Sequence, residues 1–335
     1  MKEIILVQNR RDGEWLRREF SQFDRAIGEL GVLTRDDVLK DSSLSRNTER
    51  IFSTWYMPVF TDEEVRVLFP KLKEVFYGAG TVNYFAEPFL KNGVRVFSAA
   101  KANGTPVAEF VVAQIILANK GYFQAQRNYK SLLWKWNFLR SRRFAESHAG
   151  NYDAKVGLIG FGAVGSQVAM LLKPYHVSVY AYDPYVKDEV FSEAGIERME
   201  LDEIFKKCDV ITNHLPDIPS TRGMLNARFF SQMKDNVTFI NTGRGAQIVE
   251  RDLSRAIRKR KNACAVLDVT RHEPVFPWSP LLWNKNVFIS PHIAGSLSQE
   301  KRRLVEQMVA AAKMIDEGMT CEYEVKLSQL EKQSR

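Results

Sequence analysis

The chain has 335 residues, 45% of them hydrophobic, and a formal net charge of +8 at pH 7. This length exceeds what one hydrophobic core usually serves, so we expect two domains. The sequence lacks the run of about 20 apolar residues that would cross a bilayer. The apolar run at residues 1–7 is too short for a signal peptide and predicts a first strand. A membrane protein is therefore not expected.

The charged residues and the cysteines also restrict the function. Basic clusters occur at 140–143, in an expected loop, and at 258–261, on an expected helix. Because no nucleic-acid-binding motif accompanies them, we interpret them as solvated faces whose field attracts anionic substrates and cofactors, with a nucleic-acid surface as the alternative. The three cysteines lie far apart without a CxxC pair, which predicts a reducing, cytoplasmic location and no disulfide or zinc site. No other metal site is expected.

The first hundred residues predict one small α/β unit. Strands are expected at 4–7, 50–53, 74–77 and 95–97, with amphipathic helices at 15–27 and 62–72. A strongly apolar helix is expected at 105–120, with Thr105 as N-cap and Pro106 at its first position. The polar, aromatic and basic segment 127–151 shows no clear period, so it predicts a linker or an arm.

From residue 155 onward, apolar strands alternate with helical patterns. The strands are expected at 156–159, 177–182, 210–213, 237–241, 263–269 and 287–290. This pattern is typical of a parallel sheet that is covered by helices on both faces. A long amphipathic helix is expected at 298–317. The fold class predicted for the chain is therefore α/β.

A glycine-rich loop follows the strand at 156–159. In this loop Gly160 permits a tight turn, Gly162 lets the backbone approach a pyrophosphate, and Gly165 lets a helix pack closely on the strand. The next strand ends at Asp183, which has the spacing of a ribose-binding acid and would repel a 2′-phosphate. The pattern predicts NAD rather than NADP, and the alternative is a structural turn without a ligand.

Three chemically distinct residues follow three later strands. Arg244 lies between two glycines, Glu273 precedes Pro274, and His292 follows Pro291. The carboxyl ends of strands in an open α/β sheet line its ligand crevice. An arginine suits a substrate carboxylate, and an imidazole paired with a carboxylate suits proton transfer near neutral pH. The combination predicts hydride transfer to or from a small carboxylated carbonyl compound. We interpret His214, at another strand end, as shaping the cofactor crevice.

Together these motifs resemble the D-isomer-specific 2-hydroxyacid dehydrogenase family, over about residues 78–295. The resemblance implies a doubly wound NAD-binding Rossmann domain at 101–296. It also implies a discontinuous, flavodoxin-like substrate domain formed by 1–100 and 297–335. It further implies that Arg244 holds the substrate carboxylate and carbonyl, that His292 is the acid/base, and that Glu273 orients His292.

The resemblance also implies which residues contact the ligands. The expected cofactor-binding residues are Gly160, Phe161, Gly162, Ala163, Val164, Gly165, Asp183, Pro184, His214, Leu215, Pro216, Thr221, Thr242, Gly243, Arg244, Asp268, His292, Ala294 and Gly295. The expected substrate-binding residues are Trp55, Tyr56, Ala79, Gly80, Arg244 and His292. By the same resemblance, Asp268 meets the nicotinamide carboxamide, and the backbone N–H groups around Ala79 and Gly80 meet the substrate carboxylate.

Two alternative functions and a homodimeric assembly are also considered from the sequence. The alternative function is an NAD(H)-binding corepressor of the same fold, and a formate-oxidising relative is disfavoured because Glu273, not a glutamine, precedes Pro274. A homodimer is expected through the apolar helix 105–120 and through an aromatic arm with Trp134 and Trp136. We interpret Phe138 as part of the same arm. The alternative is that these three aromatic residues anchor the arm on the chain's own core.

Overall fold

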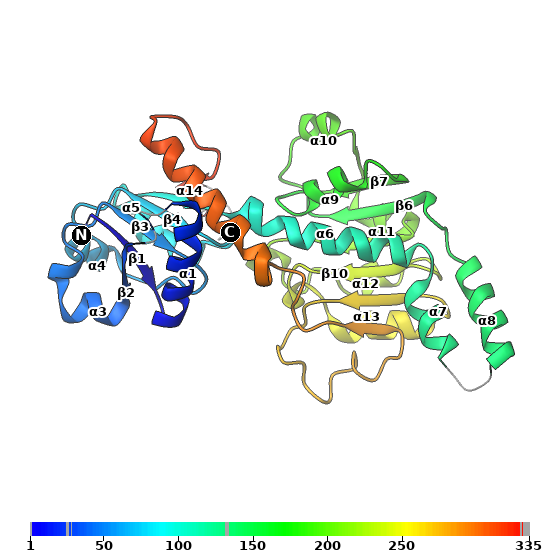
Figure 1. The fold of residues 1–335 in the computed structure, drawn as a ribbon. Coiled ribbons are helices and arrows are strands. Elements are labelled where there is room, and N and C mark those ends of the chain that lie inside the picture. Colours follow the sequence, from blue (N-terminus) through cyan, green and yellow to red (C-terminus); the bar gives the residue numbers. More distant parts are fainter. Residues whose placement is uncertain (1, 25–26, 28, 131–133, 329, 331–335) are drawn as a thin grey trace. The chain divides into compact units, whose positions relative to one another are not determined.

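The computed structural model describes residues 2–24, 27, 29–130, 134–328 and 330. The chain divides into two compact units, and each is described by itself (Figure 1). Unit 1 comprises residues 1–104 and 296–335, and unit 2 comprises residues 105–295. No helix among the described residues is long and apolar enough to cross a bilayer.

Unit 1 is built on a mainly parallel sheet in the order β13-β5-β4-β3-β1-β2. Its strands are β1 (Glu3–Val7), β2 (Gly31–Thr34), β3 (Arg50–Ser53), β4 (Glu74–Tyr77), β5 (Arg95–Ser98) and β13 (Glu324–Val325). Only β13 among these runs antiparallel, beside β5. The order of the first five strands is the flavodoxin-like order, whose switch point lies between β1 and β3.

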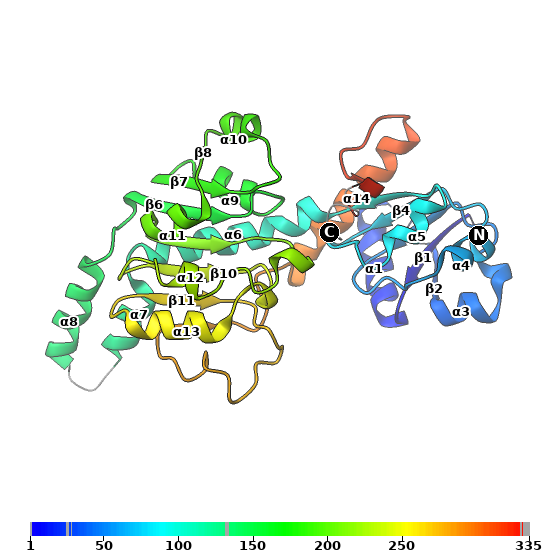
Figure 2. The same cartoon turned by 180° about the vertical axis from the view of Figure 1, so that it is seen from behind.

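Helices cover both faces of the unit 1 sheet (Figures 1 and 2). On one face lie α1 (Arg10–Phe23) and α14 (Arg302–Asp316), which share a core with alternate β1 residues. On the other face lie α3 (Arg35–Lys40), α4 (Asp62–Leu68) and α5 (Ala86–Lys91). Short 3-10 turns occur at η1 (Ser42–Leu44) and η4 (Ser298–Lys301). The two covered faces explain why the strands are short and almost continuously apolar.

Unit 2 is built on a parallel sheet in the order β12-β11-β10-β9-β6-β7-β8. Its strands are β6 (Tyr152–Ile159), β7 (His176–Tyr182), β8 (Glu197–Arg198), β9 (Val210–Asn213), β10 (Thr238–Asn241), β11 (Cys264–Leu267) and β12 (Val287–Ile289). This is the doubly wound Rossmann order with one more strand at its end. The predicted α/β class and both architectures are confirmed, and the switch point lies between β6 and β9.

The helices of unit 2 also lie on two faces. Figure 1 shows α6 (Ala100–Ala118) and α9 (Gly165–Leu172) in front of the sheet. Figure 2 shows α11 (Leu201–Lys207), α12 (Ala227–Phe230) and α13 (Glu250–Lys259) in front of the opposite face. The remaining elements are α10 (Asp188–Ala194), η2 (Pro219–Thr221) and η3 (Gly245–Gln247). The apolar cores under the two layers are separate.

The expected start of the helix at 105–120 is wrong. The helix α6 begins at Ala100, and Pro106 lies inside it. The preceding alanines favour helix strongly, so the helix extends through the first turns even though Pro106 contributes no backbone N–H. Most of its apolar residues are buried in the core of unit 2, including Val111 and Ile115. The apolar excess of this helix therefore serves the chain's own core.

The segment 127–151 is also more regular than predicted. It contains the end of α7 (Tyr122–Tyr129) and the whole of α8 (Trp134–Glu146), so the basic cluster at 140–143 lies on a helix rather than in a loop. The segment's hydrophobic pattern is inverted, which explains why its period was missed. Its inward positions are polar and its outward positions are aromatic, the reverse of an ordinary surface helix.

Other differences concern element boundaries. The strand β2 and the helix α3 were not predicted, because β2 has only Val32 and Leu33 as fully buried residues. The short edge strands β8 and β13 carry no alternation that a sequence pattern would detect. The helix expected at 15–27 instead begins at Arg10, where Asn9 caps it, and ends at Phe23. The helix expected at 62–72 ends at Leu68, and the one expected at 298–317 begins with η4.

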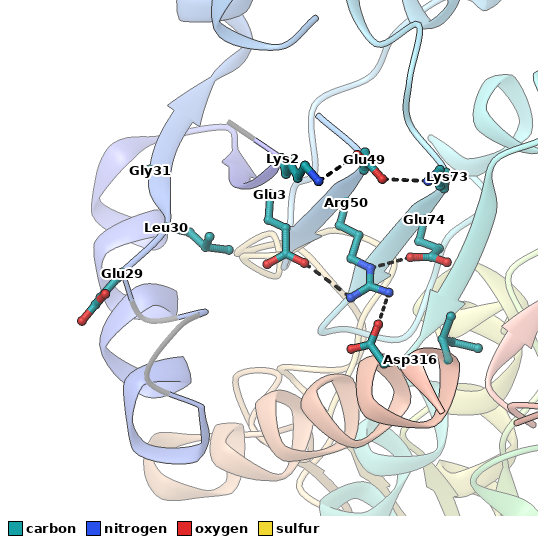
Figure 3. Close-up of a pocket in the computed structure, with 11 residues that line it drawn as sticks. Lys2, Glu3, Glu29, Leu30, Gly31, Glu49, Arg50, Lys73, Glu74 and Asp316 are labelled. Atoms are coloured by element: carbon teal, nitrogen blue, oxygen red, sulfur yellow. Dashed lines mark hydrogen bonds and ion pairs between the residues drawn. The ribbon is translucent and has the colours of Figure 1, made fainter. Parts of the chain in front are cut away.

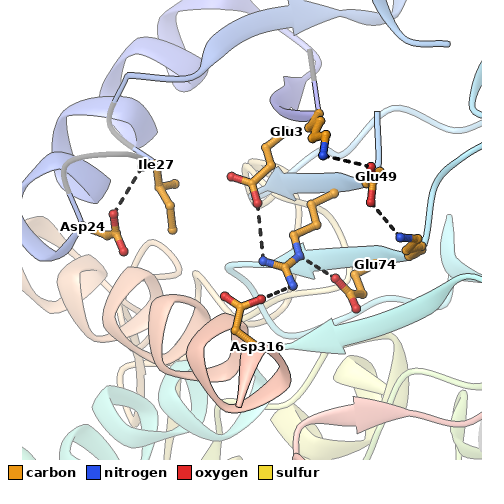
Figure 4. Close-up of polar contacts among 9 residues, drawn as sticks. Glu3, Asp24, Ile27, Glu49, Glu74 and Asp316 are labelled. Carbon is orange, nitrogen blue, oxygen red and sulfur yellow. Dashed lines mark hydrogen bonds and ion pairs between the residues drawn. The ribbon is translucent and has the colours of Figure 1, made fainter. Parts of the chain in front are cut away.

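A charged pocket of about 780 Å³ lies at the amino-terminal edge of the unit 1 sheet (Figure 3). Arg50 occupies its centre and donates to Glu74 at 2.6 Å, to Glu3 at 3.4 Å and to Asp316 of α14. Figure 4 shows how Glu3, Glu74 and Asp316 converge there. These contacts raise the pKa of Arg50 and join α14 to three strands, β1, β3 and β4. The predicted site residues follow the opposite ends of the strands, so this pocket serves architecture.

Candidate functional site

The glycine loop after β6 has the geometry that the sequence predicts. Gly160 has φ +96°, and a Cβ there would lie 2.9 Å from the backbone of His214. A Cβ on Gly165 would lie 2.1 Å from the carbonyl oxygen of Gly160, so no larger residue fits either position. A Cβ on Gly162 would meet no atom within 4 Å. The loop is therefore packed at its two ends and open in the middle, as a phosphate cradle requires.

Asp183 is joined directly to this loop. Its Oδ2 accepts a hydrogen bond from the Phe161 N–H at 2.9 Å, and its Oδ1 accepts one from the Tyr185 N–H at 3.0 Å. Each carboxylate oxygen has a second lone pair, so the group retains capacity for a ribose hydroxyl. The exposed Pro184 contributes to the same turn. The carboxylate thus positions the loop as well as facing the place where a ribose is expected.

His214 is a half-buried imidazole that directly follows β9. Burial lowers its pKa to about 3. Its Nε2 lies 3.1 Å from the Thr212 hydroxyl, while its Nδ1 is buried without a hydrogen-bond partner among the described residues. A group that stays neutral across physiological pH does not exchange protons readily, which favours a packing role beside Gly160.

The backbone of Arg244 is held by a network of buried amides. The side-chain oxygen of Gln247 accepts the Arg244 N–H at 2.9 Å, and its amide nitrogen donates to the carbonyl of Pro216 at 2.9 Å. The amide of Asn213 donates to Gln247 at 2.6 Å and to Asn241 at 2.9 Å. All three amide side chains are fully buried. The network joins the arginine loop to the 214–216 loop, as expected of a fully satisfied buried polar cluster.

This network was not predicted from the sequence. Asn213 and Asn241 each end a buried strand. A polar residue at the end of an apolar run is the sequence signal that could have indicated this network. Gln247 carries no signal of its own, because only the fold brings its side chain beneath Gly243. A Cβ on Gly243 would lie 2.7 Å from the Gln247 oxygen, so this glycine is required by packing.

The side chain of Arg244 is exposed and makes one hydrogen bond, from Nη1 to the carbonyl of Gly243 at 2.8 Å. Among the described residues no carboxylate lies within 4 Å of its guanidinium. The guanidinium therefore keeps most of its donors for an external acceptor, and a bidentate carboxylate suits its geometry.

The loops after β11 and β12 bring Glu273 and His292 together. The Nδ1 atom of His292 lies 2.7 Å from Oε2 of Glu273, and both side chains are about half exposed. The other carboxylate oxygen accepts the Thr270 N–H at 3.2 Å. With Nδ1 facing the carboxylate, Nε2 is the ring atom that remains free to exchange a proton with a ligand.

Asp268 holds the loop that carries His292. Its carboxylate is buried and accepts hydrogen bonds from the Ser290 hydroxyl at 2.6 Å and from the backbone N–H groups of Ile293 and Ala294 at 2.9 and 2.8 Å. Its carbonyl accepts the His292 N–H at 2.9 Å. His292 itself has φ +55°, a left-handed conformation that a non-glycine residue adopts only where its surroundings impose it. The acid therefore determines the position of the imidazole.

In unit 1, the two predicted backbone donors after β4 differ. The Ala79 N–H already donates to the carbonyl of Tyr77 at 2.9 Å, because the chain turns sharply there. The Gly80 N–H has no hydrogen-bond partner among the described residues. The carbonyl of Gly80 accepts the Ser98 hydroxyl at 2.8 Å, which fixes the turn. Of the two amides, only that of Gly80 is available to a ligand without loss of an existing bond.

The two predicted aromatic residues after β3 also differ. Trp55 is partly buried and packs against the core of unit 1. Tyr56 is 74% exposed and has φ +61°. The neighbouring Met57 N–H donates to the Tyr84 hydroxyl at 2.9 Å, which holds the turn. Tyr56, rather than Trp55, therefore presents its ring at the carboxyl-terminal edge of this sheet.

The remaining predicted cofactor residues fit a dinucleotide to different degrees. The hydroxyl of Thr242 is buried without a hydrogen-bond partner among the described residues, so a ligand there would satisfy it. The N-terminus of α9, which begins at Gly165 after Val164, has no side-chain cap, and its amides suit a phosphate. The hydroxyl of Thr221 instead donates to the carbonyl of Pro216 at 2.7 Å, which holds its own loop.

The chain is similar to known proteins in sequence. Residues 112–294 match the family described as D-isomer specific 2-hydroxyacid dehydrogenase, NAD binding domain. The D-3-phosphoglycerate dehydrogenase of Archaeoglobus fulgidus is 34% identical over 219 residues, which cover 65% of this chain and 40% of that protein. The enzyme of the same name from Methanocaldococcus jannaschii is 31% identical over 234 residues, or 70% and 43% of the two chains. The chain thus spans less than half the length of these curated relatives.

The chain is also similar to solved structures. A D-isomer specific 2-hydroxyacid dehydrogenase from Lactobacillus delbrueckii ssp. bulgaricus, solved as an NAD complex, superposes with a TM-score of 0.74 at 20% identity over 97% of this chain and all of that one. A D-2-hydroxyisocaproate dehydrogenase superposes with a TM-score of 0.72 at 20% identity, over 96% and 99% of the two chains. At this identity the likeness establishes the fold.

Proposed function

We propose, since this chain belongs to the D-isomer specific 2-hydroxyacid dehydrogenase family, that it interconverts a D-2-hydroxyacid and its 2-keto acid with NAD. Family membership confirms the resemblance seen in the sequence, and the NAD-binding domain that matches confirms the predicted cofactor. The activity is proposed for the whole chain, and its substrate is a small 2-hydroxy or 2-keto acid.

Each residue of the site has a distinct task in this proposal. When bound, NAD supplies the acceptor or the donor of the hydride. The glycine loop and the N-terminus of α9 hold its pyrophosphate, and Asp183 holds its ribose. Arg244 binds the substrate carboxylate and the carbonyl oxygen through parallel N–H donors. Within unit 1, the Gly80 amide is the backbone donor available to a carboxylate.

The proton moves at Nε2 of His292. In the reductive direction a protonated His292 gives this proton to the carbonyl oxygen, and in the oxidative direction the neutral ring accepts it from the hydroxyl. Glu273 accepts a hydrogen bond from Nδ1, orients the ring and stabilises its charged form. Asp268 positions the loop.

One observation carries the proposal: the 2.7 Å contact between His292 and Glu273, on loops that follow adjacent strands. The loop with Arg244 follows the next strand in the sheet. A corepressor that only binds NAD(H) needs the glycine loop and Asp183 but has no use for a carboxylate–imidazole pair beside an unpaired guanidinium.

The test is NADH oxidation with a panel of 2-keto acids: glyoxylate, hydroxypyruvate, pyruvate and bulkier analogues. We expect turnover with at least one of them, and the D-enantiomer of the product should be the only one oxidised in reverse. NADH binding without turnover on the whole panel would favour the corepressor-like alternative and contradict the proposed enzyme.

A homodimer and a cytoplasmic location also belong to the proposal. The described side chains of the arm formed by α7 and α8 place Asn137 and Ser141 inside, while Trp136 is 78% and Phe138 is 50% exposed. Exposed aromatic clusters of this kind mark protein interfaces. The side chain of Trp134 lies outside the described residues. The three cysteines are buried and unpaired, which suits a reducing compartment.

A further inference from the structure

Lys301 is held between two indole rings in unit 1. Its Nζ lies 5.4 Å from the ring centre of Trp15 on α1 and 5.7 Å from that of Trp55 in the loop after β3. Both distances fall within the range of cation–π attraction. An ordinary surface lysine samples many rotamers, but two aromatic faces restrict this ammonium to one place.

This ammonium has no carboxylate partner within the described part of the chain. Other lysines of unit 1 are paired, such as Lys73 with Glu49 at 2.7 Å and Lys101 with Glu322 at 3.4 Å. Lys301 is also partly buried, so its charge is less hydrated than theirs. A positioned, unpaired and partly desolvated cation is suited to an external anion.

Its place in the fold relates it to the substrate. Trp55 lies two residues beyond the end of β3, and β3 pairs with β4, which leads to the Gly80 amide. Neighbouring strands are about 4.8 Å apart. Trp55 and the Gly80 amide therefore belong to adjacent loops at one edge of the sheet, and the ammonium of Lys301 lies against the ring of Trp55 in the first of these loops.

We infer that Lys301 selects 2-keto acids that carry a second anionic group at the far end of a short chain. This inference rests on the proposed function and on the Gly80 amide of the same unit as the donor to the first carboxylate. The second group is a carboxylate or a phosphate, since both accept a hydrogen bond from an ammonium and both are attracted by its charge. Trp15 is a positioning residue that keeps the ammonium in place.

The experiment compares matched substrates with the full chain and NADH. 2-Oxoglutarate and 2-oxopentanoate have the same carbon chain, and only the first has a distal carboxylate. Phosphohydroxypyruvate and hydroxypyruvate form the corresponding phosphate pair. We expect the wild-type kcat/KM to favour the dianionic member of one pair, and the preferred pair identifies the anion.

Substitutions of Lys301 and Trp15 then separate the effect of the ammonium charge from the effect of its position. Lys301→Met should lower kcat/KM for the preferred dianion by about ten- to a hundredfold, as for loss of one charge-assisted contact, and should change the monoanion by less than about threefold. Lys301→Arg should retain the preference. Trp15→Leu should weaken it while the charge remains. Lys313→Met, which removes an exposed charge from the adjoining α14, is the matched control.

The outcomes are distinguishable. Equal kcat/KM values within both wild-type pairs, or an equal loss for both members of a pair in Lys301→Met, would overturn the role of Lys301 and leave the proposed dehydrogenase activity standing. If no member of either pair, nor any 2-keto acid of the wider panel, is reduced by the wild-type protein, the proposed function itself fails.

Discussion

Oδ2 of Asp183 accepts the backbone N–H of Phe161 at 2.9 Å, so one carboxylate both positions the glycine loop and faces the expected cofactor ribose. This relationship makes two roles separable by substitution. Asparagine retains an acceptor for the Phe161 N–H but loses the negative charge, whereas alanine loses both.

We therefore expect NAD(H) to be strongly preferred over NADP(H), because the carboxylate would repel a 2′-phosphate. Asp183→Asn should relax the ratio of the two specificity constants by about tenfold or more, since like-charge contacts in a binding site cost several kcal/mol. Asp183→Ala should in addition weaken binding of both cofactors. Steady-state kinetics with each cofactor provide the measurement. An unchanged ratio in Asp183→Asn would remove this residue from the ribose site.

The contact between His292 and Glu273 predicts a pH dependence. Reduction needs the protonated ring and oxidation the neutral ring, so kcat/KM for a keto acid should fall toward high pH and the oxidative profile should show the opposite limb. Glu273→Gln keeps an acceptor but loses the charge that stabilises the imidazolium, so the limb of the reductive profile should move to lower pH. His292→Gln should abolish the limb and nearly all turnover. If Glu273→Gln left the pH profile of kcat/KM unchanged, the proposed proton transfer through His292 and Glu273 would be contradicted.

Arg244→Ala should remove most turnover while folding and NADH binding stay nearly intact. The guanidinium has no carboxylate partner among the described residues, so its loss deprives mainly the substrate of a charge-assisted contact. We expect kcat/KM to fall by about a hundredfold or more, with NADH fluorescence titration unchanged. Arg255→Ala on α13 is the control. Near-normal kcat/KM in Arg244→Ala would place this residue outside the active site.

The inverted arm predicts a dimer that depends on its aromatic face. The wild-type protein should have twice the chain mass of 38.5 kDa by light scattering at micromolar concentration. Trp136→Ser combined with Phe138→Ser should produce a monomer, because these rings are the two most exposed apolar side chains among those described on α8. Tyr152→Ser, which removes an equally exposed ring from β6, should leave the dimer intact. A monomeric wild type would refute the assembly.

His214 predicts how stability responds to acid. Burial lowers its pKa to about 3 in the folded chain, whereas an unfolded histidine titrates near 6.5. The unfolded state therefore binds an extra proton below about pH 6.5, and the stability present above this pH is lost as pH falls toward the folded pKa.

Urea titrations of the apo-protein between about pH 6 and 4 measure this effect, because the group contributes up to about 1.4 kcal/mol per pH unit to the slope of the unfolding free energy. His214→Gln should reduce the slope by about this amount. His176→Gln, at an exposed histidine on β7, should not. Equal slopes in the two variants would show that His214 is accessible to protons in the folded state.

Features that depend on local patterns could be predicted from the sequence alone. Short apolar runs separated by amphipathic stretches indicated parallel sheets, and a glycine triplet between a strand and a helix indicated the nucleotide loop. Arg244, Glu273 and His292 were recognisable because each follows a buried strand, and ends of parallel strands meet at one edge. These signals are encoded within about ten neighbouring residues and need no knowledge of distant contacts.

Contacts between groups that are distant in the chain could be identified only from the folded structure. Gln247 is unremarkable in the sequence, yet the fold buries it beneath Arg244 and joins it to Asn213 of another strand. Lys301 becomes a positioned cation only when α1 and the loop after β3 bring two indoles against it. The polar interior of the arm inverts the pattern on which helix prediction depends. Such contacts join residues far apart in the chain, and their energies arise from packing and desolvation, which a local pattern does not contain.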